Sequence, residues 1–436
     1  MCNLTNIRKG DVTLTQHDTL LSGCRVLDLT DEKGHLAGKV LGDFGADVVK
    51  IEKPGGDSSR NVGPFYKDMA DPEKSLFWFA GNTSKRGITL DIEKPEGREI
   101  FKKLVETADI VLESFEPGYM DGMGLGYLEL KKIKLDIIVT SITPFGQSGP
   151  YVHYQTTDLV ATAMGGLARV LGDMGRPPVR MSCDPQAYFH AGLQGALGSM
   201  MAYYHRALSG EGQHVDVSMQ DAVILALMHA VEISEIMKVN VIGMGQFFVS
   251  VRPAPQPPLF TRLIVPCKDG YVFFGFGGGG FGGMVQSTRA MVEWANEEGM
   301  LLEFKDVDFS QWDVSSMTQE ESDRRNAVVG EFLMTKTKAE LYDQAVKRGI
   351  MLAPCNTIED VIENAQLEVR GFWEKVEHPE LGETITYPGA PVKIEEAPWR
   401  IQRRAPFISE HNEEIYIEEL GFSREQMSVL EASGVI

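Results

Sequence analysis

Strand and helix patterns alternate along the first part of the chain, and this alternation limits the possible folds more than any other feature. A β-branched run at 24–30 precedes an amphipathic helical pattern at 33–45, and a second apolar run follows at 47–52. The same order continues through 87–142, where Pro95 opens one of the predicted helices. Consecutive parallel strands need a crossover connection, so the pattern predicts a parallel sheet with helices on both faces. Ligands of such sheets bind beyond the carboxyl ends of the strands.

The 436 residues are too many for one compact core, and the composition changes along the chain. We expect a helical stretch from Asp158 to Ser209 and a strand at 214–219, and the proline-rich segment at 252–260 marks a break. The fold class is therefore predicted to be α/β, with a large doubly wound, Rossmann-like domain and a smaller α+β domain. The expected segments are an N-terminal extension (1–21), the large domain (22–230), a linker (231–262), the small domain (263–392), and a linker with C-terminal helices that return to the large domain (393–436).

Charge and motif content exclude several classes of function. Acidic residues number 62 and basic residues 42, which gives a formal net charge of −20. Such a chain repels phosphate backbones and anionic membranes, so we expect neither nucleic acid nor membrane as a partner. The sequence contains no G-x-S-x-G elbow, no G-x-x-x-x-G-K-[ST] loop and no H-E-x-x-H helix. Hydrolase, P-loop and zinc-protease functions therefore lack their usual motifs.

Cysteine usage and hydropathy indicate the compartment. The five cysteines form no C-x-x-C pair and no zinc-like spacing with the nine histidines, so we expect reduced thiols and no metal site. No run of about 18 uninterrupted apolar residues occurs, and the N-terminal residues lack the pattern of a signal peptide. The sequence predicts a soluble, cytoplasmic protein.

A conspicuous run of glycines occupies 275–283, directly after an apolar strand pattern. It satisfies G-x-G-x-x-G, the fingerprint of a dinucleotide site. The rest of that fingerprint needs a second strand ending in an acidic residue about 20 positions on, whereas 284–299 is helical in pattern. Two further interpretations stay open: a simple turn, and a mobile loop that covers a site. The residues of this candidate lid loop are Gly277, Gly278, Gly279 and Gly280.

Several segments in a fixed order carry a resemblance to one family. They include LSGCRVLDLT at 21–30, GDFGADVVKIEKPGGD at 42–57, ESFEPGYMDGMGL at 113–125, TSITPFGQSGPY at 140–151 and SGEGQHVDVSMQDAV at 209–223. From about residue 22 to its end, the chain resembles the family III CoA-transferases, a group that includes formyl-CoA:oxalate and carnitine-type CoA-transferases. The resemblance implies an enzyme that moves coenzyme A from an acyl-CoA thioester to a carboxylic acid. Coenzyme A is then a substrate, and no permanently bound cofactor is expected.

Asp158, in the segment TTDLVATAMGG, matches the position of the family's aspartate nucleophile. The chemistry suits a lone carboxylate, because an aspartate with a pKa near 3.9 is ionised at pH 7 and needs no general base. The resemblance implies an anhydride and then an aspartyl-CoA thioester on this residue. A structural alternative is that Asp158 caps the helix that follows it. The two roles are compatible, since a helix N-terminus stabilises the anion.

The resemblance also implies a CoA site at the strand ends of the large domain. Two cations that relatives often carry there are missing, because Gly122 and Thr143 occupy the matching positions, and Phe145 replaces a tyrosine. Lys85 and Arg86 either compensate or form a surface ion pair. The implied CoA-binding residues are Gly34, His35, Lys53, Leu90, Ser114, Phe115, Met123, Thr143 and Phe145.

Two other functions stay open beside CoA transfer. An α-methylacyl-CoA racemase would share the fold. The resemblance implies that its proton shuttle includes a histidine directly before the aspartate, and Thr157 occupies that position here. Asp184 fills the second racemase position, although it also suits a helix cap. A non-catalytic subunit of a hetero-oligomeric CoA-transferase is the second alternative. The family resemblance further implies a homodimer whose two chains are interlocked.

Overall fold

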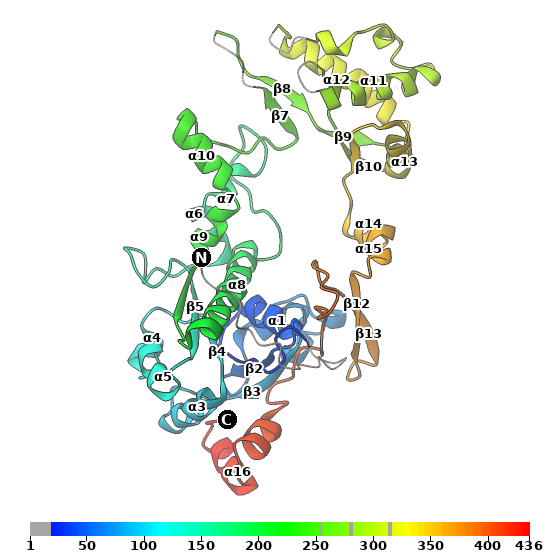
Figure 1. Cartoon of the computed structure of the whole chain (residues 1–436). Helices are drawn as coiled ribbons and strands as arrows, with labels where there is room; N and C mark the ends of the chain where they lie inside the picture. The colour runs from blue at the N-terminus through cyan, green and yellow to red at the C-terminus, as the bar shows by residue number, and fades with distance from the viewer. Residues whose placement is uncertain (1–18, 251, 253–254, 279–281, 313–315) are drawn as a thin grey trace, which may run out of the picture. The chain divides into compact units, whose positions relative to one another are not determined.

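The computed structural model describes residues 19–250, 252, 255–278, 282–312 and 316–436 (Figure 1). These residues form two compact units. The large unit holds the chain up to Leu167 together with Met181–Glu232 and Glu368–Ile436, and the small unit holds Ala168–Arg180 and Ile233–Leu367. Most of the N-terminal extension expected at 1–21 lies outside the described residues.

A six-stranded parallel sheet forms the centre of the large unit, in the order β3-β2-β1-β4-β5-β6. The order runs one way from β1 to β3 and the other way from β4 to β6, so the sheet is doubly wound and Rossmann-like. The predicted fold class is confirmed. The strands are β1 (Arg25–Asp28), β2 (Asp47–Glu52), β3 (Lys85–Thr89), β4 (Ile110–Glu113), β5 (Ile138–Thr143) and β6 (His214–Ser218).

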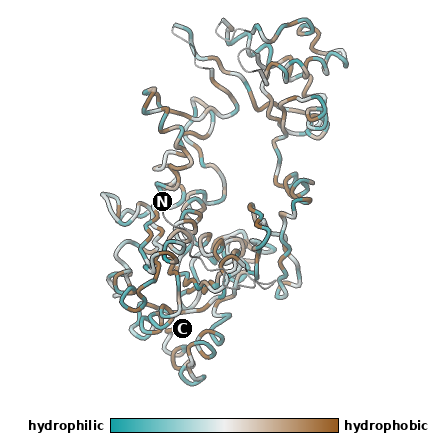
Figure 2. Tube along the Cα trace, in the orientation of Figure 1, coloured by the Kyte–Doolittle hydropathy of each residue, from teal (hydrophilic) through white to brown (hydrophobic). Residues whose placement is uncertain are grey.

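Helices cover both faces of this sheet because its strands are apolar on both sides, and hydrophobic segments gather in the central strands (Figure 2). On one face, α3 (Pro95–Thr107) and the C-terminal segment pack on the sheet, and Tyr416 donates to the Thr89 carbonyl at 2.6 Å. On the other face lie α1 (His35–Asp43) and α8 (Gln186–Ser209). Further elements of the large unit are α2 (Leu76–Asn82), α4 (Tyr119–Gly122), α5 (Tyr127–Ile133), α6 (Asp158–Met164), α9 (Met219–Leu225), the hairpin β12 (Trp373–His378) and β13 (Glu383–Pro388), the π-helix η6 (Glu413–Glu419) and α16 (Arg424–Ala432).

The continuous helical stretch predicted from Asp158 to Ser209 is wrong. Helices α6 and α7 (Leu167–Val170) are followed by a non-helical segment at 171–185 before α8 begins. Proline cannot continue a helix, and this segment contains Pro177, Pro178 and Pro185, while Gly172 has a φ of 82°. The backbone therefore leaves the helical conformation between two apolar helices.

The small unit combines short antiparallel strands with helices. Its sheets are β7–β8 and β11–β10–β9, both antiparallel. Because β10 pairs antiparallel with both neighbours, the glycine run after it does not belong to a parallel βαβ unit, and the dinucleotide interpretation is wrong. The elements are β7 (Phe247–Ser250), β8 (Leu259–Arg262), β9 (Ile264–Cys267), β10 (Gly270–Phe274), α11 (Gly282–Glu297), α12 (Gln319–Leu333), α13 (Lys338–Arg348), β11 (Leu352–Pro354) and α14 (Ile358–Ile362), with α10 (Met228–Met237) and α15 (Ala365–Val369) at its borders.

The segment expected as a linker at 231–262 therefore contains most of α10 and the β7–β8 hairpin. The domain boundaries deduced from composition remain a prediction.

A buried ion pair joins β1 to β3. Lys85 Nζ lies 2.8 Å from Asp28 Oδ2 and donates to the His35 carbonyl at 2.9 Å, and both side chains are fully buried. Burial lowers the pKa of Lys85 to about 8, and the charge of Asp28 opposes this shift. For Asp28 burial acts to raise the pKa, but the charges of Lys85 and Lys50 outweigh it and lower the pKa to about 2. The pair therefore stays ionised at pH 7.

Lys85→Met should destabilise the protein strongly, because it leaves the Asp28 carboxylate buried without its cation. Breaking a buried pair in this way costs about 3–5 kcal/mol. Denaturant unfolding at pH 7 measures the change. Lys53→Met is the control, since that side chain is 55% exposed and its ion pair should contribute no more than about 1 kcal/mol. Equal stabilities of the two variants would contradict the structural role of the pair.

Candidate functional site

Most residues of the implied CoA site lie at the carboxyl edge of the central sheet. Each predicted segment follows, or ends, a different parallel strand. This is the edge at which open α/β sheets bind ligands. The structure therefore brings together Gly34 and His35 after β1, Lys53 after β2, Leu90 after β3, Ser114 and Phe115 after β4, and Thr143 and Phe145 at the end of β5, while Met123 ends α4.

The strand order reverses between β1 and β4, and a serine joins the two strand ends at this switch point. Ser114 Oγ donates to Asp31 Oδ1 at 2.8 Å and accepts from Asp31 N at 2.9 Å. At the nearby start of α1, a Cβ on Gly34 would lie 2.5 Å from Thr30 Cγ2, so only glycine fits this close approach. The turn between β1 and α1 is thus held by side-chain bonds and by the absence of a side chain at residue 34.

An exposed cation lies at the neighbouring strand end. The Lys53 side chain is 55% exposed and pairs with Glu93 Oε1 at 2.8 Å, and Tyr119 also donates to this oxygen. Phe115 stacks on Tyr119 with ring centroids 4.8 Å apart. An exposed ion pair exchanges readily with another anion, so Lys53 is available to a phosphate.

Three other predicted residues are buried and present little side-chain surface to a ligand, and a fourth is partly buried. Leu90 is in the hydrophobic core, and His35 packs edge-on against Trp78. Thr143 is fully buried, and its Oγ1 has no hydrogen-bond partner among the described residues. Phe145 is partly buried and contacts the rings of two tyrosines.

Lys85 and Arg86 do not supply the missing cations. Lys85 is paired with Asp28. The Arg86 guanidinium binds three carboxylates at 2.6 Å, those of Asp47, Glu414 and Glu419. Both side chains are buried, so the alternative of a surface ion pair is also wrong. The burial of Lys85 and Arg86 was not recognisable from sequence, because these two residues begin β3 directly after the polar residues 82–84.

The Asp158 carboxylate binds the N-terminus of a helix other than its own. Asp158 Oδ1 accepts from Ala187 N at 2.7 Å, in the first turn of the 24-residue helix α8. Asp158 N donates to Tyr188 Oη at 3.1 Å. The residue is 8% exposed, and its carboxylate is anchored to the start of α8. Unpaired N–H groups and the helix dipole both stabilise a carboxylate at this position.

This arrangement corrects two expectations about helix caps. Thr157 is the N-cap of α6, and Asp158 is the first helical residue. Asp184 is exposed and does not cap α8, whose N-cap is Pro185. Asp158 supplies the acceptor that α8 would otherwise lack at Ala187, a long-range contact with no signal in the local sequence.

Tyr188 stays protonated beside this carboxylate. Burial, together with the charges of Glu32, Asp31 and Asp158, raises its pKa to about 12. Burial and the charge of Asp31 also raise the pKa of Glu32. The neighbourhood of Asp158 is therefore acidic, and at neutral pH the tyrosine offers a hydroxyl proton rather than a further charge.

A row of polar side chains across β4, β5 and β6 was missed by sequence analysis. Ser141 Oγ lies 2.8 Å from His214 Nε2 and also hydrogen-bonds the carboxyl group of Glu113, which accepts from Phe115 N at 2.8 Å. Burial raises the pKa of Glu113 to about 7 against these hydrogen bonds. The available signal was three polar residues in apolar strands. Strand register pairs Glu113 with Ser141, whereas His214 is paired with Val139 and reaches Ser141 diagonally.

Within the described ranges, no group of three or more His, Cys, Asp or Glu side chains could hold a metal ion. Across the same residues, every helix is too short or too polar to span a bilayer.

Comparison with known proteins defines the class. Residues 21–412 match CoA-transferase family III, so the chain belongs to this family and is a CoA-transferase. It is 35% identical to succinyl-CoA:(R)-benzylsuccinate CoA-transferase subunit BbsE of Thauera aromatica, covering 90% of this chain and 93% of that one. It is 30% identical to formyl-CoA:oxalate CoA-transferase of Streptomyces coelicolor, covering 95% and 99%. A crystal structure of a CAIB/BAIF family protein from Brucella suis superposes with a TM-score of 0.77 at 27% identity, covering 92% of this chain and 99% of that one.

Glu113→Gln should flatten the pH dependence of stability. The pKa of Glu113 is raised from 4.5 to about 7 in the folded protein, so the folded state holds the proton more tightly. That stabilisation is complete below about pH 4.5 and is lost as pH rises through 7. Between pH 5 and 8, the wild type should lose roughly 2–4 kcal/mol more unfolding free energy than the glutamine variant. Exposed Glu106→Gln is the control, and a wild-type slope in Glu113→Gln would contradict the assignment.

Proposed function

We propose that this enzyme transfers coenzyme A from an acyl-CoA thioester to a free carboxylic acid through covalent intermediates on Asp158. The observation that carries the proposal is the Asp158 carboxylate, which binds the N-terminus of α8, where backbone N–H groups and the helix dipole favour the anion. Family membership gives the reaction class, and the named relatives act as CoA-transferases on acyl-CoA and carboxylate substrates. Only the reaction class is carried over to this chain from their names.

The proposed steps conserve bonds and charge. A carboxylate oxygen of Asp158 attacks the thioester carbonyl, forming a mixed anhydride and releasing CoA thiolate. The thiolate attacks the aspartyl carbonyl, which releases the donor acid and leaves an aspartyl-CoA thioester. The acceptor carboxylate opens this thioester to a second anhydride, and the returning thiolate takes the acyl group to give the new acyl-CoA and free Asp158. Each step exchanges one acyl bond for another, so no ATP is required.

The carboxyl edge of the sheet is the proposed CoA site. Lys53 is its exposed cation and suits a phosphate, while Ser114, Phe115 and the backbone near Gly34 line the neighbouring turns. The buried residues Leu90 and Thr143 would shape the site from below. The lid role of Gly277 and Gly278 stays a prediction, and Gly279 and Gly280 lie outside the described residues.

The racemase alternative receives little support from these contacts. Racemisation needs two acid–base groups on opposite faces of a carbon. Thr157 takes the place next to Asp158, and its side chain makes no capping hydrogen bond. Asp184 accordingly lacks a basic partner at that position, and no observation favours proton shuttling over CoA transfer.

Asp158→Asn should abolish CoA transfer while the fold survives. An asparagine oxygen can still accept from Ala187 N, but the amide is not an anionic nucleophile. We expect a loss of at least about 1,000-fold in kcat, measured as exchange between succinyl-CoA and a panel of carboxylic acids. With acyl-CoA and no acceptor, hydroxylamine should convert wild-type Asp158 to a hydroxamate, detected by mass on its peptide.

Exposed Asp184→Asn is the matched control and should transfer CoA and form the Asp158 hydroxamate like the wild type. Wild-type transfer by Asp158→Asn, with deamidation excluded by mass, would refute the mechanism. Loss of transfer together with loss of cooperative unfolding would show instead that Asp158 is needed for the fold.

We also propose that the functional protein is a homodimer, as the family resemblance implies. One face of α8 carries a line of exposed apolar side chains at helical spacing, and such a contiguous patch marks an interface. The opposite face of α8 packs on α1 and β5 inside the large unit. The exposed residues are Phe189, Leu193, Leu197, Met201, Tyr204 and Leu208.

The double substitution Leu197→Glu with Met201→Glu should dissociate the dimer, because it places two charges in the middle of the apolar line. Sedimentation equilibrium should show a dimer for the wild type and a monomer with native secondary structure for the variant. Leu128→Glu is the control, since Leu128 is 70% exposed on α5, away from this face. A wild-type monomer at micromolar concentration would contradict the proposal, and dimerisation only with a second, related chain would identify a hetero-oligomer.

A further inference from the structure

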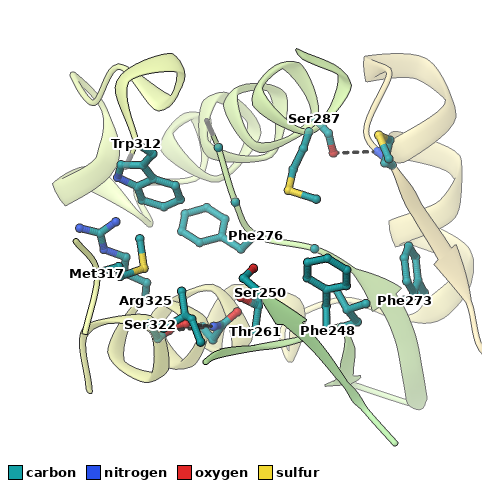
Figure 3. A pocket seen from close by; sticks show the side chains of 18 residues that line it. Phe248, Ser250, Thr261, Phe273, Phe276, Ser287, Trp312, Met317, Ser322 and Arg325 are labelled. Carbon is teal, nitrogen blue, oxygen red and sulfur yellow. Dashed lines mark hydrogen bonds between the residues drawn. The ribbon is translucent and has the colours of Figure 1, made fainter. Parts of the chain in front are cut away.

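The small unit contains a cavity of about 340 Å³, open to solvent, in a part of the chain to which the proposed function assigns no substrate contact (Figure 3). It lies among the β7–β8 hairpin, the residues after β10, the start of α11, and α12. The volume falls in the range of small-molecule sites, whereas well-packed interiors leave few voids larger than a water molecule. A cavity of this size therefore requires an explanation other than imperfect packing.

Apolar and aromatic side chains line most of the cavity. Phe276 is buried near its centre and meets Trp312 edge-on, with ring centroids 5.3 Å apart. Phe248, Phe273 and Met351 are 40–52% exposed, so the apolar lining continues to the opening. Aromatic rings prefer such edge contacts with another ring, which favours an aryl group or a similar flat apolar body as the occupant.

The glycine run helps to form this cavity by close backbone packing. A Cβ on Gly277 would lie 2.6 Å from Met284 Sδ, and one on Gly278 would lie 2.2 Å from the Phe309 carbonyl oxygen. Thr288 Oγ1 also donates to the Gly277 carbonyl at 2.6 Å. Close packing beside the cavity thus requires glycine at 277 and 278, and neither residue has a positive φ.

One cation stands at one side of the apolar lining. Arg325 lies beside Trp312 and Met317, on the side of the cavity away from Phe248 and Phe273 (Figure 3). Its guanidinium carbon is 4.3 Å from the centroid of the Trp312 ring, and its Nε donates to Glu321 at 2.5 Å. Nη1 is buried and has no hydrogen-bond partner among the described residues. A buried guanidinium nitrogen without an acceptor is costly, and a ligand carboxylate would satisfy it.

We propose that this cavity binds an aryl-substituted carboxylic acid, with the ring among Phe276, Phe248 and Phe273 and the carboxylate on Arg325. The apolar side and the cationic side match the two ends of such an acid. Among the other polar groups of the lining, Ser287 accepts from Met351 N at 2.9 Å, Ser322 donates to the Phe260 carbonyl at 3.3 Å, and Asn326 donates to the Ser322 carbonyl at 2.7 Å. Carboxylic acids are also the acceptors of the proposed CoA transfer. Only the identification of this ligand with that acceptor rests on the proposed function.

Isothermal titration calorimetry of the full-length protein with 3-phenylpropanoate tests the proposal without any CoA substrate. The acid should bind, 3-phenylpropan-1-ol should bind about 10- to 100-fold more weakly because it lacks the charge, and propanoate should show no saturable binding. Absence of 3-phenylpropanoate binding to the wild type, or equal binding of the alcohol, would overturn the proposal.

Thr261→Phe locates the ligand. Thr261 lines the cavity on β8 and pairs with Phe248 on β7, so a phenyl ring there fills space that the ligand would use. Binding should fall at least tenfold while the unfolding temperature stays the same or rises. Val249→Phe is the matched control, because Val249 neighbours Phe248 on β7 but is not among the lining residues. Unchanged binding in Thr261→Phe would place the ligand elsewhere and refute the assignment.

Arg325→Met tests the charge. Binding of the acid should weaken about 10- to 100-fold, to the level of the alcohol, while binding of the alcohol stays constant. A purely structural role would weaken both ligands together. Arg324→Met is the control, since Arg324 pairs with the same Glu321 but is outside the lining.

Asp158→Asn should bind 3-phenylpropanoate like the wild type. If transfer persists in that variant but the acid binds with the expected pattern, the proposed function fails and the cavity assignment stands. If the acid does not bind while Asp158→Asn abolishes transfer, the cavity assignment fails and the proposed function stands.

Discussion

The Asp28–Lys85 ion pair stabilises the carboxyl edge of the central sheet, where the proposed CoA site lies. Asp28 ends β1, and its other carboxylate oxygen accepts from both the backbone and the hydroxyl of Thr30. Lys85 reaches from β3 to the carbonyl of His35, the first residue of α1. A single ion pair thus fixes both ends of the turn between β1 and α1. The Lys50 charge also stabilises the Asp28 carboxylate, and the strand–turn–helix unit depends on the pair staying ionised.

On the proposed mechanism, one carboxylate, that of Asp158, serves the fold and the chemistry together. Binding the N-terminus of α8 lowers the energy of the carboxylate anion. The same stabilisation makes an anion less reactive, so a nucleophile in this position must gain rate from orientation. The bond from Asp158 Oδ1 to Ala187 N supplies that orientation, because α8 is long and packed against α1 and β5.

Sequence reasoning recovered the features that repeat locally and missed those created by contact. Alternating patterns predicted the parallel sheet and the helix that begins at Pro95, since propensity and periodicity act over a few residues. The break at 171–185 was missed because apolar helices flank it on both sides. The contact of Asp158 with Ala187 joins residues 29 positions apart, and the Arg325 environment depends on packing between α12 and the residues before it. No local pattern encodes such contacts.

The excess of negative charge and the internal pairing of the buried cations limit how the protein can bind an anionic substrate. The chain carries a net charge of −20, and its buried cations are neutralised internally, Lys85 by Asp28, Arg60 by Glu52 and Arg86 by Asp47. Near the strand ends, Lys53 remains exposed, and its own partner Glu93 reduces its field. Long-range repulsion therefore opposes the approach of CoA phosphates, and salt screens that repulsion. On the proposed function, affinity for CoA must come chiefly from short-range hydrogen bonds and from burial of its apolar parts, which the strand-end turns can provide.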